Sequence, residues 1–158
     1  WYSYNITQEE LQNFPANTKM ISQIYDDDTV NDHRMAIDIY NNINITDEDK
    51  DSILVKSTVL PTYTYVADHG TPNNRKAYDA YDFYAIYRLL DAMTDYVFNN
   101  NQAAKNTALG NGSAEQITMP SYRGQALAPL EVTDRATPKY DESKYEFKYG
   151  DTLNPRRE

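Results

Sequence analysis

The chain has 158 residues, enough for one domain with a sizeable core, and 40% of them are hydrophobic, which argues against wholesale disorder. Its net charge of −9 argues against a nucleic-acid or anionic-membrane partner, because both require basic patches. The absence of Cys excludes disulfides and thiolate metal sites, and no apolar run approaches the roughly 20 residues needed to span a bilayer.

The N-terminal segment predicts a helix, a strand and an acidic turn. Thr7-Gln8-Glu9-Glu10 matches a capping box, so a short helix is expected to run to about Asn13. The apolar run from Lys19 to Tyr25 is typical of a buried strand. It breaks abruptly into three consecutive carboxylates, Asp26, Asp27 and Asp28.

A second helix and a second strand are expected next. The helix runs from about His33 to Asn42, with either Asn31 or Asp32 as its N-cap. Ser52 to Val59 is rich in β-branched residues and predicts a strand. Strands that alternate with helices indicate a parallel sheet.

A histidine loop precedes the longest predicted helix. An extended piece from Tyr63 to Ala67 leads into the loop that holds His69. From about Ala77 to Phe98, apolar residues recur three and four positions apart without Gly or Pro, which predicts a long amphipathic helix. Its apolar stripe comprises Phe83, Ile86, Leu90, Met93 and Val97.

The C-terminal segment differs in character. Residues 101–158 hold four of the seven prolines and few aliphatic clusters, so we expect an extended C-terminal arm that packs on the domain formed by residues 1–100. Tyr145, Phe147 and Tyr149 alternate with charged residues and predict one short strand there. Two parallel strands are too few for a stable sheet, so further strands are expected from elsewhere.

An acid after one parallel strand and a histidine after the next form a suggestive pair. Catalytic groups gather at the carboxyl ends of strands in open α/β sheets. A carboxylate there can fix the tautomer of the imidazole and stabilise its protonated form. We therefore name Asp28, or its neighbour Asp27, and His69 as candidate catalytic residues, with Asp28 favoured. For each of them, a turn-capping or surface role is the alternative.

These residues resemble the α/β-hydrolase family over roughly residues 17–100. KMISQIYDDDTVNDHRMAIDIY is similar to the family's late strand, acid turn and following helix. SILVKSTVLPTYTYVADHG is similar to its last core strand and histidine loop. The resemblance implies an α/β fold, the C-terminal portion of a parallel sheet with flanking helices. It also implies a serine hydrolase of carboxylic esters or related acyl bonds, with the triad in the order Ser, acid, His.

The nucleophile of that family is missing. The G-x-S-x-G elbow is absent, and Gly110 to Ala114 is not one because it lacks the final Gly and follows no strand. The chain also begins at Trp1, so we expect a fragment or a processed product. The expected partners are an upstream nucleophile-bearing portion, in the same protein or as a separate chain, and a small acyl or ester substrate. Without that portion we expect no activity. A secreted or periplasmic location is favoured.

Two other interpretations of the chain, and the role of the second histidine, remain to be stated. The chain could be a non-catalytic binding or assembly module that keeps a hydrolase-like architecture. Asp26, Asp28 and Asp32 could instead surround calcium, but the EF-hand glycine and twelfth-position glutamate are absent, so no metal or other cofactor is predicted. His33 lies in the first turn of a helix, where a positive charge is unfavourable, and is expected to serve local packing or capping.

Overall fold

The centre of the fold is a three-stranded mixed sheet. The computed structural model describes residues 3–73 and 78–157. The strand order is β1 (Met20–Tyr25), β2 (Lys50–Val55) and β7 (Glu131–Val132). β1 and β2 run parallel, whereas β7 runs antiparallel to β2. β1 therefore lies at one edge of this sheet.

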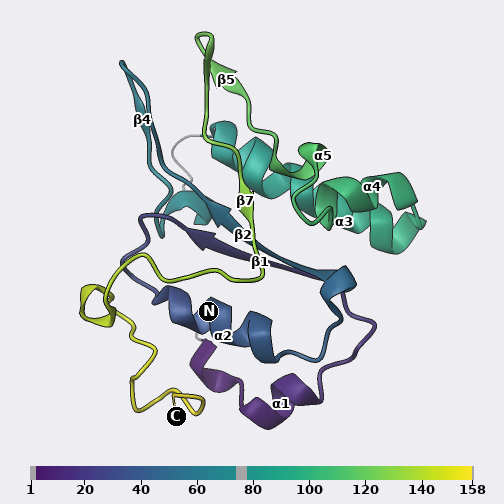
Figure 1. The fold of residues 1–158 in the computed structure, drawn as a ribbon, viewed down its shortest axis with the longest axis vertical. Coiled ribbons are helices and arrows are strands. Elements are labelled where there is room, and N and C mark those ends of the chain that lie inside the picture. Colours follow the sequence, from purple (N-terminus) through teal and green to yellow (C-terminus); the bar gives the residue numbers. More distant parts are fainter. Residues whose placement is uncertain (1–2, 74–77, 158) are drawn as a thin grey trace.

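Helices cover the two faces of the sheet (Figure 1). On one face lie α1 (Gln8–Gln12) and α2 (His33–Asn42), where Leu11 forms a small buried cluster with Ile43 and Ile45. On the other face lie the π-helix η4 (Tyr81–Tyr87) and α3 (Arg88–Asn99). The larger buried cluster on that face joins strand and helix residues, among them Ile53, Val55, Tyr81, Ala85, Leu89, Leu127 and Leu130.

Two helix starts follow the predicted capping signals. The Thr7 side chain accepts a hydrogen bond from the backbone NH of Glu10, and the Glu10 carboxylate accepts one from the backbone NH of Thr7, which confirms the capping box. For α2, the structure decides between the two predicted caps, because the Asp32 carboxylate accepts the backbone NH of Arg34. Local polar signals of this kind are reliable because donor and acceptor lie within one turn.

The predicted second strand is shorter than expected. β2 ends at Val55, and the chain then forms a small antiparallel hairpin of β3 (Thr58–Val59) and β4 (Thr64–Tyr65). Short 3₁₀ segments complete this part of the fold and the two ends. They are η1 (Ser3–Asn5), η2 (Asp47–Asp49), η3 (Thr71–Asn73) and η5 (Glu142–Lys144).

Residues 101–158 are not an extended arm. They form α4 (Gln102–Ala108), α5 (Ala114–Ile117), a hairpin of β5 (Ser121–Tyr122) and β6 (Gln125–Ala126), and then β7. No strand forms at 145–149, where Phe147 instead forms an isolated parallel bridge with Asn31. Two-residue strands have no measurable period, so the alternation of side chains could not reveal them.

The long helix buries a different stripe from the predicted one. Tyr81, Ala85 and Leu89 are buried, whereas Phe83 and Leu90 of the predicted stripe are exposed. The helix begins with the π-helical segment η4, in which each turn holds more residues than in an α-helix, so the angular position of later side chains shifts. The predicted start at Ala77 lies outside the described residues.

The predicted fold class is therefore wrong. An α/β-hydrolase-like parallel sheet with an extended C-terminal arm is replaced by a mixed three-stranded sheet, two small hairpins and flanking helices. The third strand comes from the chain's own C-terminal segment rather than from elsewhere. Among the residues that the structure describes, no helix is both long and apolar enough to cross a membrane.

Candidate active site

The turn after β1 holds Asp28 in a fixed orientation. Its Oδ1 accepts hydrogen bonds from the backbone NH groups of Val30 at 2.7 Å and Asn31 at 3.1 Å. The side chain is nearly buried, because the residue keeps only 7% of its surface exposed. Short Asp side chains commonly bond to backbone NH groups two or three residues ahead, and this fixes the turn. The second oxygen, Oδ2, is left for another partner.

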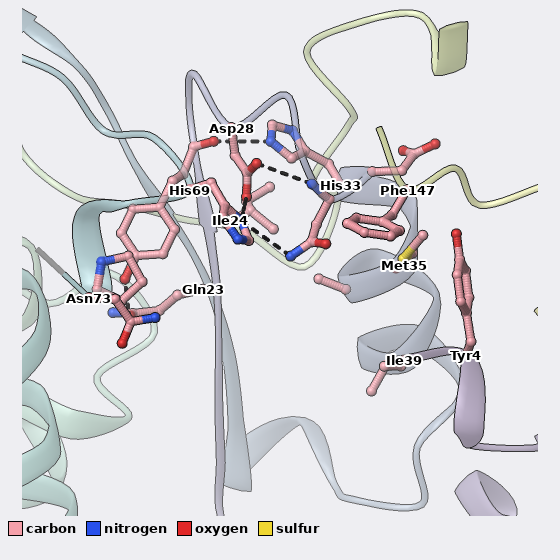
Figure 2. A pocket seen from close by; sticks show the side chains of 15 residues that line it. Tyr4, Gln23, Ile24, Asp28, His33, Met35, Ile39, His69, Asn73 and Phe147 are labelled. Carbon is pink, nitrogen blue, oxygen red and sulfur yellow. Dashed lines mark hydrogen bonds and ion pairs between the residues drawn. The ribbon is translucent and has the colours of Figure 1, made fainter. Parts of the chain in front are cut away.

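His69 supplies that partner. The Nδ1 atom of His69 lies 3.2 Å from Asp28 Oδ2 (Figure 2). The loop that carries His69 is held by Asp68, whose Oδ1 accepts the backbone NH of Gly70 and whose own NH donates to Thr71 Oγ1. The acid and the histidine named from the sequence are thus in direct contact, although 41 positions separate them.

The contact implies one tautomer of His69. The Asn31 amide nitrogen lies 3.4 Å from the same Nδ1 atom, but it is a donor and cannot share a protonated Nδ1. The shorter contact to a carboxylate is the stronger one, so we assign the proton to Nδ1, donating to Asp28. In neutral His69, Nε2 is then the basic nitrogen.

A cavity opens beside this pair. It has a volume of about 310 Å³ and is lined on one side by His69, Asp28 and Asn73 and on the other by residues of β1 and α2. The His69 side chain is 48% exposed, and its Nε2 atom has no hydrogen-bond partner among residues 3–73 and 78–157. Within those residues no Ser or Thr hydroxyl hydrogen-bonds to Nε2.

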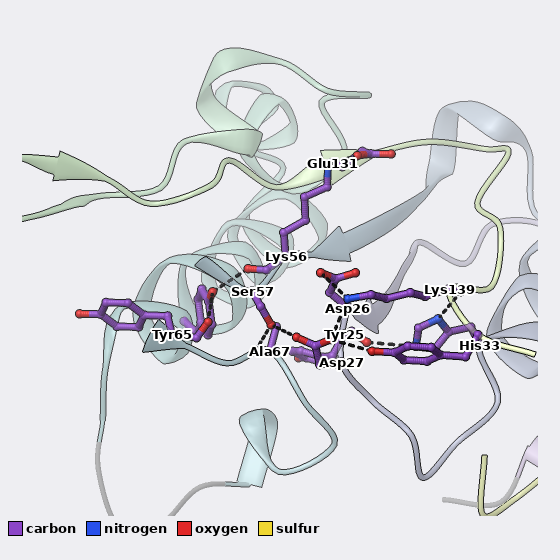
Figure 3. Close-up of polar contacts among 12 residues, drawn as sticks. Tyr25, Asp26, Asp27, His33, Lys56, Ser57, Tyr65, Ala67, Glu131 and Lys139 are labelled. Atoms are coloured by element: carbon purple, nitrogen blue, oxygen red, sulfur yellow. Dashed lines mark hydrogen bonds and ion pairs between the residues drawn. The ribbon is translucent and has the colours of Figure 1, made fainter. Parts of the chain in front are cut away.

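Asp27 lies in a different environment (Figure 3). Its carboxylate accepts hydrogen bonds from Ser57 Oγ at 2.5 Å, Lys139 Nζ at 2.7 Å and the Tyr140 hydroxyl at 2.8 Å. Burial disfavours the charged carboxylate, but the three hydrogen bonds outweigh burial and lower the pKa of Asp27 to about 2. Asp27 makes no hydrogen bond to His69 among the described contacts, so the structure pairs His69 with Asp28.

Lys139 and Ser57 tie this cluster to the rest of the fold. Lys139 also lies 3.1 Å from Asp26, and these carboxylates raise its pKa although burial opposes the rise. Ser57 Oγ accepts the backbone NH of the buried residue Ala67 at 2.9 Å. The cluster of Asp27, Ser57, Lys139 and Tyr140 thereby joins the ends of β1 and β2 to the C-terminal segment.

His33 is a buried packing residue, as expected from its position. Its Nε2 donates to the backbone carbonyl of Tyr25 at 3.0 Å, and its Nδ1 accepts the backbone NH of Lys139 at 3.4 Å. Burial lowers the pKa of His33. Both ring nitrogens are occupied, so His33 has no free atom with which to act on a substrate.

The three carboxylates of the calcium interpretation have separate partners. Asp26 pairs with Lys139, Asp28 contacts His69, and Asp32 caps α2 while it also accepts the backbone NH of Tyr149. Among the described residues no group of three or more His, Cys, Asp or Glu side chains could hold a metal ion. The arrangement gives the calcium interpretation no support.

Sequence reasoning missed several members of the site. The sequence points to Asn31 only as a helix cap and to Ser57 only as part of the predicted strand from Ser52 to Val59, whereas β2 ends at Val55 and leaves Ser57 in the following loop. No sequence signal points to Lys139 or Tyr140, because they lie 112 and 113 positions from Asp27. No family model, curated protein or solved structure matches this chain.

Proposed function

We propose that Asp28 and His69 form the acid–base half of a hydrolytic site for carboxylic esters or related acyl bonds. A nucleophilic serine would come from an upstream portion of the same protein or from a separate chain. The observation that carries the proposal is the 3.2 Å contact between His69 Nδ1 and Asp28 Oδ2, with Nε2 left open beside a cavity. The geometry of acid and base, rather than the fold, is what such chemistry requires.

The pair would act in two rounds of proton transfer, one as the acyl-enzyme forms and one as it is hydrolysed. His69 Nε2 takes the proton of the attacking hydroxyl as its oxygen bonds to the acyl carbon. His69 then returns this proton to the leaving alkoxide as the ester bond breaks and an acyl-enzyme forms. A water molecule, deprotonated by the same nitrogen, then bonds to the acyl carbon. The bond from that carbon to the serine oxygen breaks, and His69 returns the proton to this oxygen, which releases the acid and regenerates the hydroxyl. Asp28 touches no reacting atom and serves as a positioning residue that stabilises the imidazolium.

The fixed orientation of Asp28 supports this role. Because two backbone NH groups hold Oδ1, the carboxylate cannot rotate away from the imidazole without losing both hydrogen bonds. Its low exposure reduces screening of the charge by water, which strengthens its attraction for an imidazolium. The apolar side chains of Ile24 and Met35 in the cavity wall suit the acyl part of a small ester.

A non-catalytic assembly module is the second candidate. It is favoured by the exposed apolar side chains Phe83, Leu90, Val97 and Phe98 on the helix η4–α3. Exposed apolar patches mark surfaces that contact other molecules. This candidate predicts assembly without hydrolysis.

The test starts from the native protein in its source. Native mass spectrometry would show whether the 18.2 kDa chain is isolated alone or in complex with a nucleophile-bearing portion. We expect the larger species, and we expect it to hydrolyse p-nitrophenyl butyrate, with His69→Ala lowering kcat about 10³-fold or more. The matched control is His33→Gln, a change at the other histidine of the chain, which should retain activity. A lone chain without hydrolysis, or an active assembly that tolerates His69→Ala, would contradict the proposal.

A further inference from the structure

The candidate active-site cavity is polar at one end and apolar at the other. The polar end holds His69 and Asp28. The apolar end, here called the α2 cleft, lies between β1 and α2 and is walled by Ile24, Met35, Ala36 and Ile39. Met35 and Ile39 are four positions apart and project from successive turns of α2 (Figure 2). Ile24 and Met35, on opposite walls, each keep only 6% of their surface exposed, so the cleft is narrow and suits a linear chain better than an aromatic ring.

The polar side chains beside the α2 cleft are already bonded to the protein. The Gln23 amide donates to the carbonyl of Ala85 at 2.6 Å, and its oxygen accepts the Tyr25 hydroxyl at 3.1 Å. Both ring nitrogens of His33 are occupied, and the Tyr4 hydroxyl donates to a backbone carbonyl. A polar substituent on a bound chain would therefore lose its water without gaining a hydrogen bond from these side chains. The cleft favours plain hydrocarbon.

The α2 cleft ends at Ile39. This side chain packs against the buried cluster of Leu11, Ile43 and Ile45, and close packing behind it leaves no space for a longer ligand. A methylene group is about as large as a water molecule, whose share of liquid volume is about 30 Å³, so a cavity of about 310 Å³ holds roughly ten non-hydrogen atoms. An acyl chain of about eight carbons with its two ester oxygens contains that number.

We infer that the α2 cleft binds the acyl chain of the substrate, and that the substrate is an ester of an unbranched aliphatic acid of up to about eight carbons. The inference rests on the proposed function and names the substrate class of that site. The carbonyl carbon lies at the polar end beside His69 Nε2, and the chain extends toward Ile39. Ile39 is then the specificity-determining residue, because its side chain sets the longest chain that fits.

The test measures the affinity of ethyl esters for the 158-residue chain without any partner, where the esters should stay intact. In NMR titrations from ethyl acetate to ethyl decanoate, the methyl signals of Met35 and Ile39 should shift. Affinity should rise about fourfold for each added methylene up to the octanoate and then level off. Ethyl benzoate should bind more weakly than ethyl hexanoate. The absence of binding, an affinity that keeps rising to the decanoate, or benzoate binding as tight as hexanoate binding would overturn the inference.

Ile39→Ala should lengthen the chain that fits. It removes the end wall of the cleft, so ethyl decanoate should bind about tenfold more tightly than to the unmodified chain, as two further methylenes become buried. Ile86→Ala is the matched control, because Ile86 is also partly buried but packs on the α3 side of the sheet. It should leave ester binding unchanged. Equal decanoate affinities in the two variants would contradict the role of Ile39.

Ala36→Leu tests the same cleft from its helical wall if Ile39→Ala does not fold. The larger side chain occupies part of the cleft, so ethyl octanoate should bind about tenfold more weakly, whereas ethyl acetate should stay within about twofold. Unchanged octanoate affinity in a folded Ala36→Leu chain would overturn the inference.

Failure of this inference and failure of the proposed function give different results. His69→Ala should keep the binding of ethyl esters, because the α2 cleft does not use the imidazole. Binding that depends on chain length, in a protein whose assembled form hydrolyses no ester, would overturn the proposed function alone. An assembled protein that hydrolyses acetate, octanoate and benzoate esters with equal kcat/KM would overturn the acyl-chain inference alone.

Discussion

Asp27 and Asp28 are neighbours in one turn, yet they have different surroundings. Asp27 accepts hydrogen bonds from one ammonium and two hydroxyl groups at 2.5 to 2.8 Å. Asp28 uses one oxygen for backbone NH groups and offers the other to an imidazole. A carboxylate saturated with strong donors stays ionised and holds its neighbours together. A carboxylate that keeps one oxygen for an exposed imidazole can instead fix the orientation of that ring.

The comparison shows how one strand end can serve two purposes. The Asp27 cluster joins both parallel strands to the C-terminal segment through Ser57 and Lys139. This anchoring keeps the acidic turn rigid, and the rigid turn holds Asp28 against His69. Rigid support from neighbouring contacts is what a positioned acid–base pair requires. The predictions below separate the two aspartates, from the largest expected effect to the smallest.

Asp28→Asn should have the largest effect on catalysis. An Asn side chain can present its NH₂ group to Nδ1, which favours the tautomer with the proton on Nε2, so His69 loses its basic nitrogen at the reactive position. We expect kcat of the assembled protein toward p-nitrophenyl butyrate to fall about 10³- to 10⁴-fold. Asp27→Asn is the matched control and should stay within about tenfold of the unmodified protein, since Asp27 does not contact the imidazole. Equal losses in the two variants would remove the distinction between them.

The tautomer itself can be measured in the 158-residue chain without any partner. Nitrogen-15 NMR of neutral His69 should show the proton on Nδ1, and Asp28→Asn should move it to Nε2. An Nε2 proton in the unmodified chain would contradict the assigned contact with Asp28.

Ser57→Ala should act on stability rather than on catalysis. It removes one donor from Asp27 and leaves the backbone NH of the buried residue Ala67 without a partner. An unsatisfied buried group of this kind costs about 1–3 kcal/mol, so the free energy of unfolding in urea should fall by that amount. Ser121→Ala, at an exposed serine, is the control and should change stability by less than about 0.5 kcal/mol. A similar value for both variants would mean that the Asp27 cluster is not a structural anchor.

Much of the local structure follows from the sequence because its causes are local. Thr7 and Glu10 cap a helix from three residues apart, and Asp32 caps the next helix from the position before it. The approach of Asp28 to His69 could also be expected. Asp28 follows β1, and the parallel strand β2 ends at the same end of the sheet, although His69 itself comes only after the β3–β4 hairpin that follows β2.

The rest of the fold depends on contacts between distant segments. Lys139 and Tyr140 bind Asp27 and so leave Asp28 as the partner of His69. No residue near the acidic turn in the sequence predicts these two contacts. β7 has two residues, so its antiparallel pairing with β2 left no periodic signal. The stripe of Phe83 and Leu90 was wrongly expected to be the main buried face of the long helix, because periodicity assumes a regular α-helix and η4 is a π-helix.

The pH dependence of the free energy of unfolding should show a smaller effect that is specific to Asp27. The pKa of Asp27 is about 2 in the folded chain, against 3.8 for an unperturbed aspartate, so its hydrogen bonds stabilise the fold above pH 3.8. That contribution is lost as the pH falls from 3.8 toward 2. In Asp27→Asn, urea unfolding measured across this window should show a slope with pH that is smaller by up to one proton. An unchanged slope would show that Asp27 does not hold its charge through these contacts.

His33, which accepts the backbone NH of Lys139, should give the smallest effect and a separate pH window. Burial lowers the pKa of His33 in the folded chain below the 6.5 of an unperturbed histidine. As the pH falls through 6.5, the unfolded chain therefore binds a proton that the folded chain does not yet bind. The free energy of unfolding should therefore be highest above pH 6.5 and decline below it. His33→Gln should flatten this decline, whereas Asp27→Asn should leave it intact, because Asp27 in the folded chain titrates near pH 2, in a separate and more acid range. If Asp27→Asn abolished the decline as well, protonation of His33 would be coupled to the charge of Asp27, and the cluster would be part of a wider electrostatic network rather than a fixed anchor.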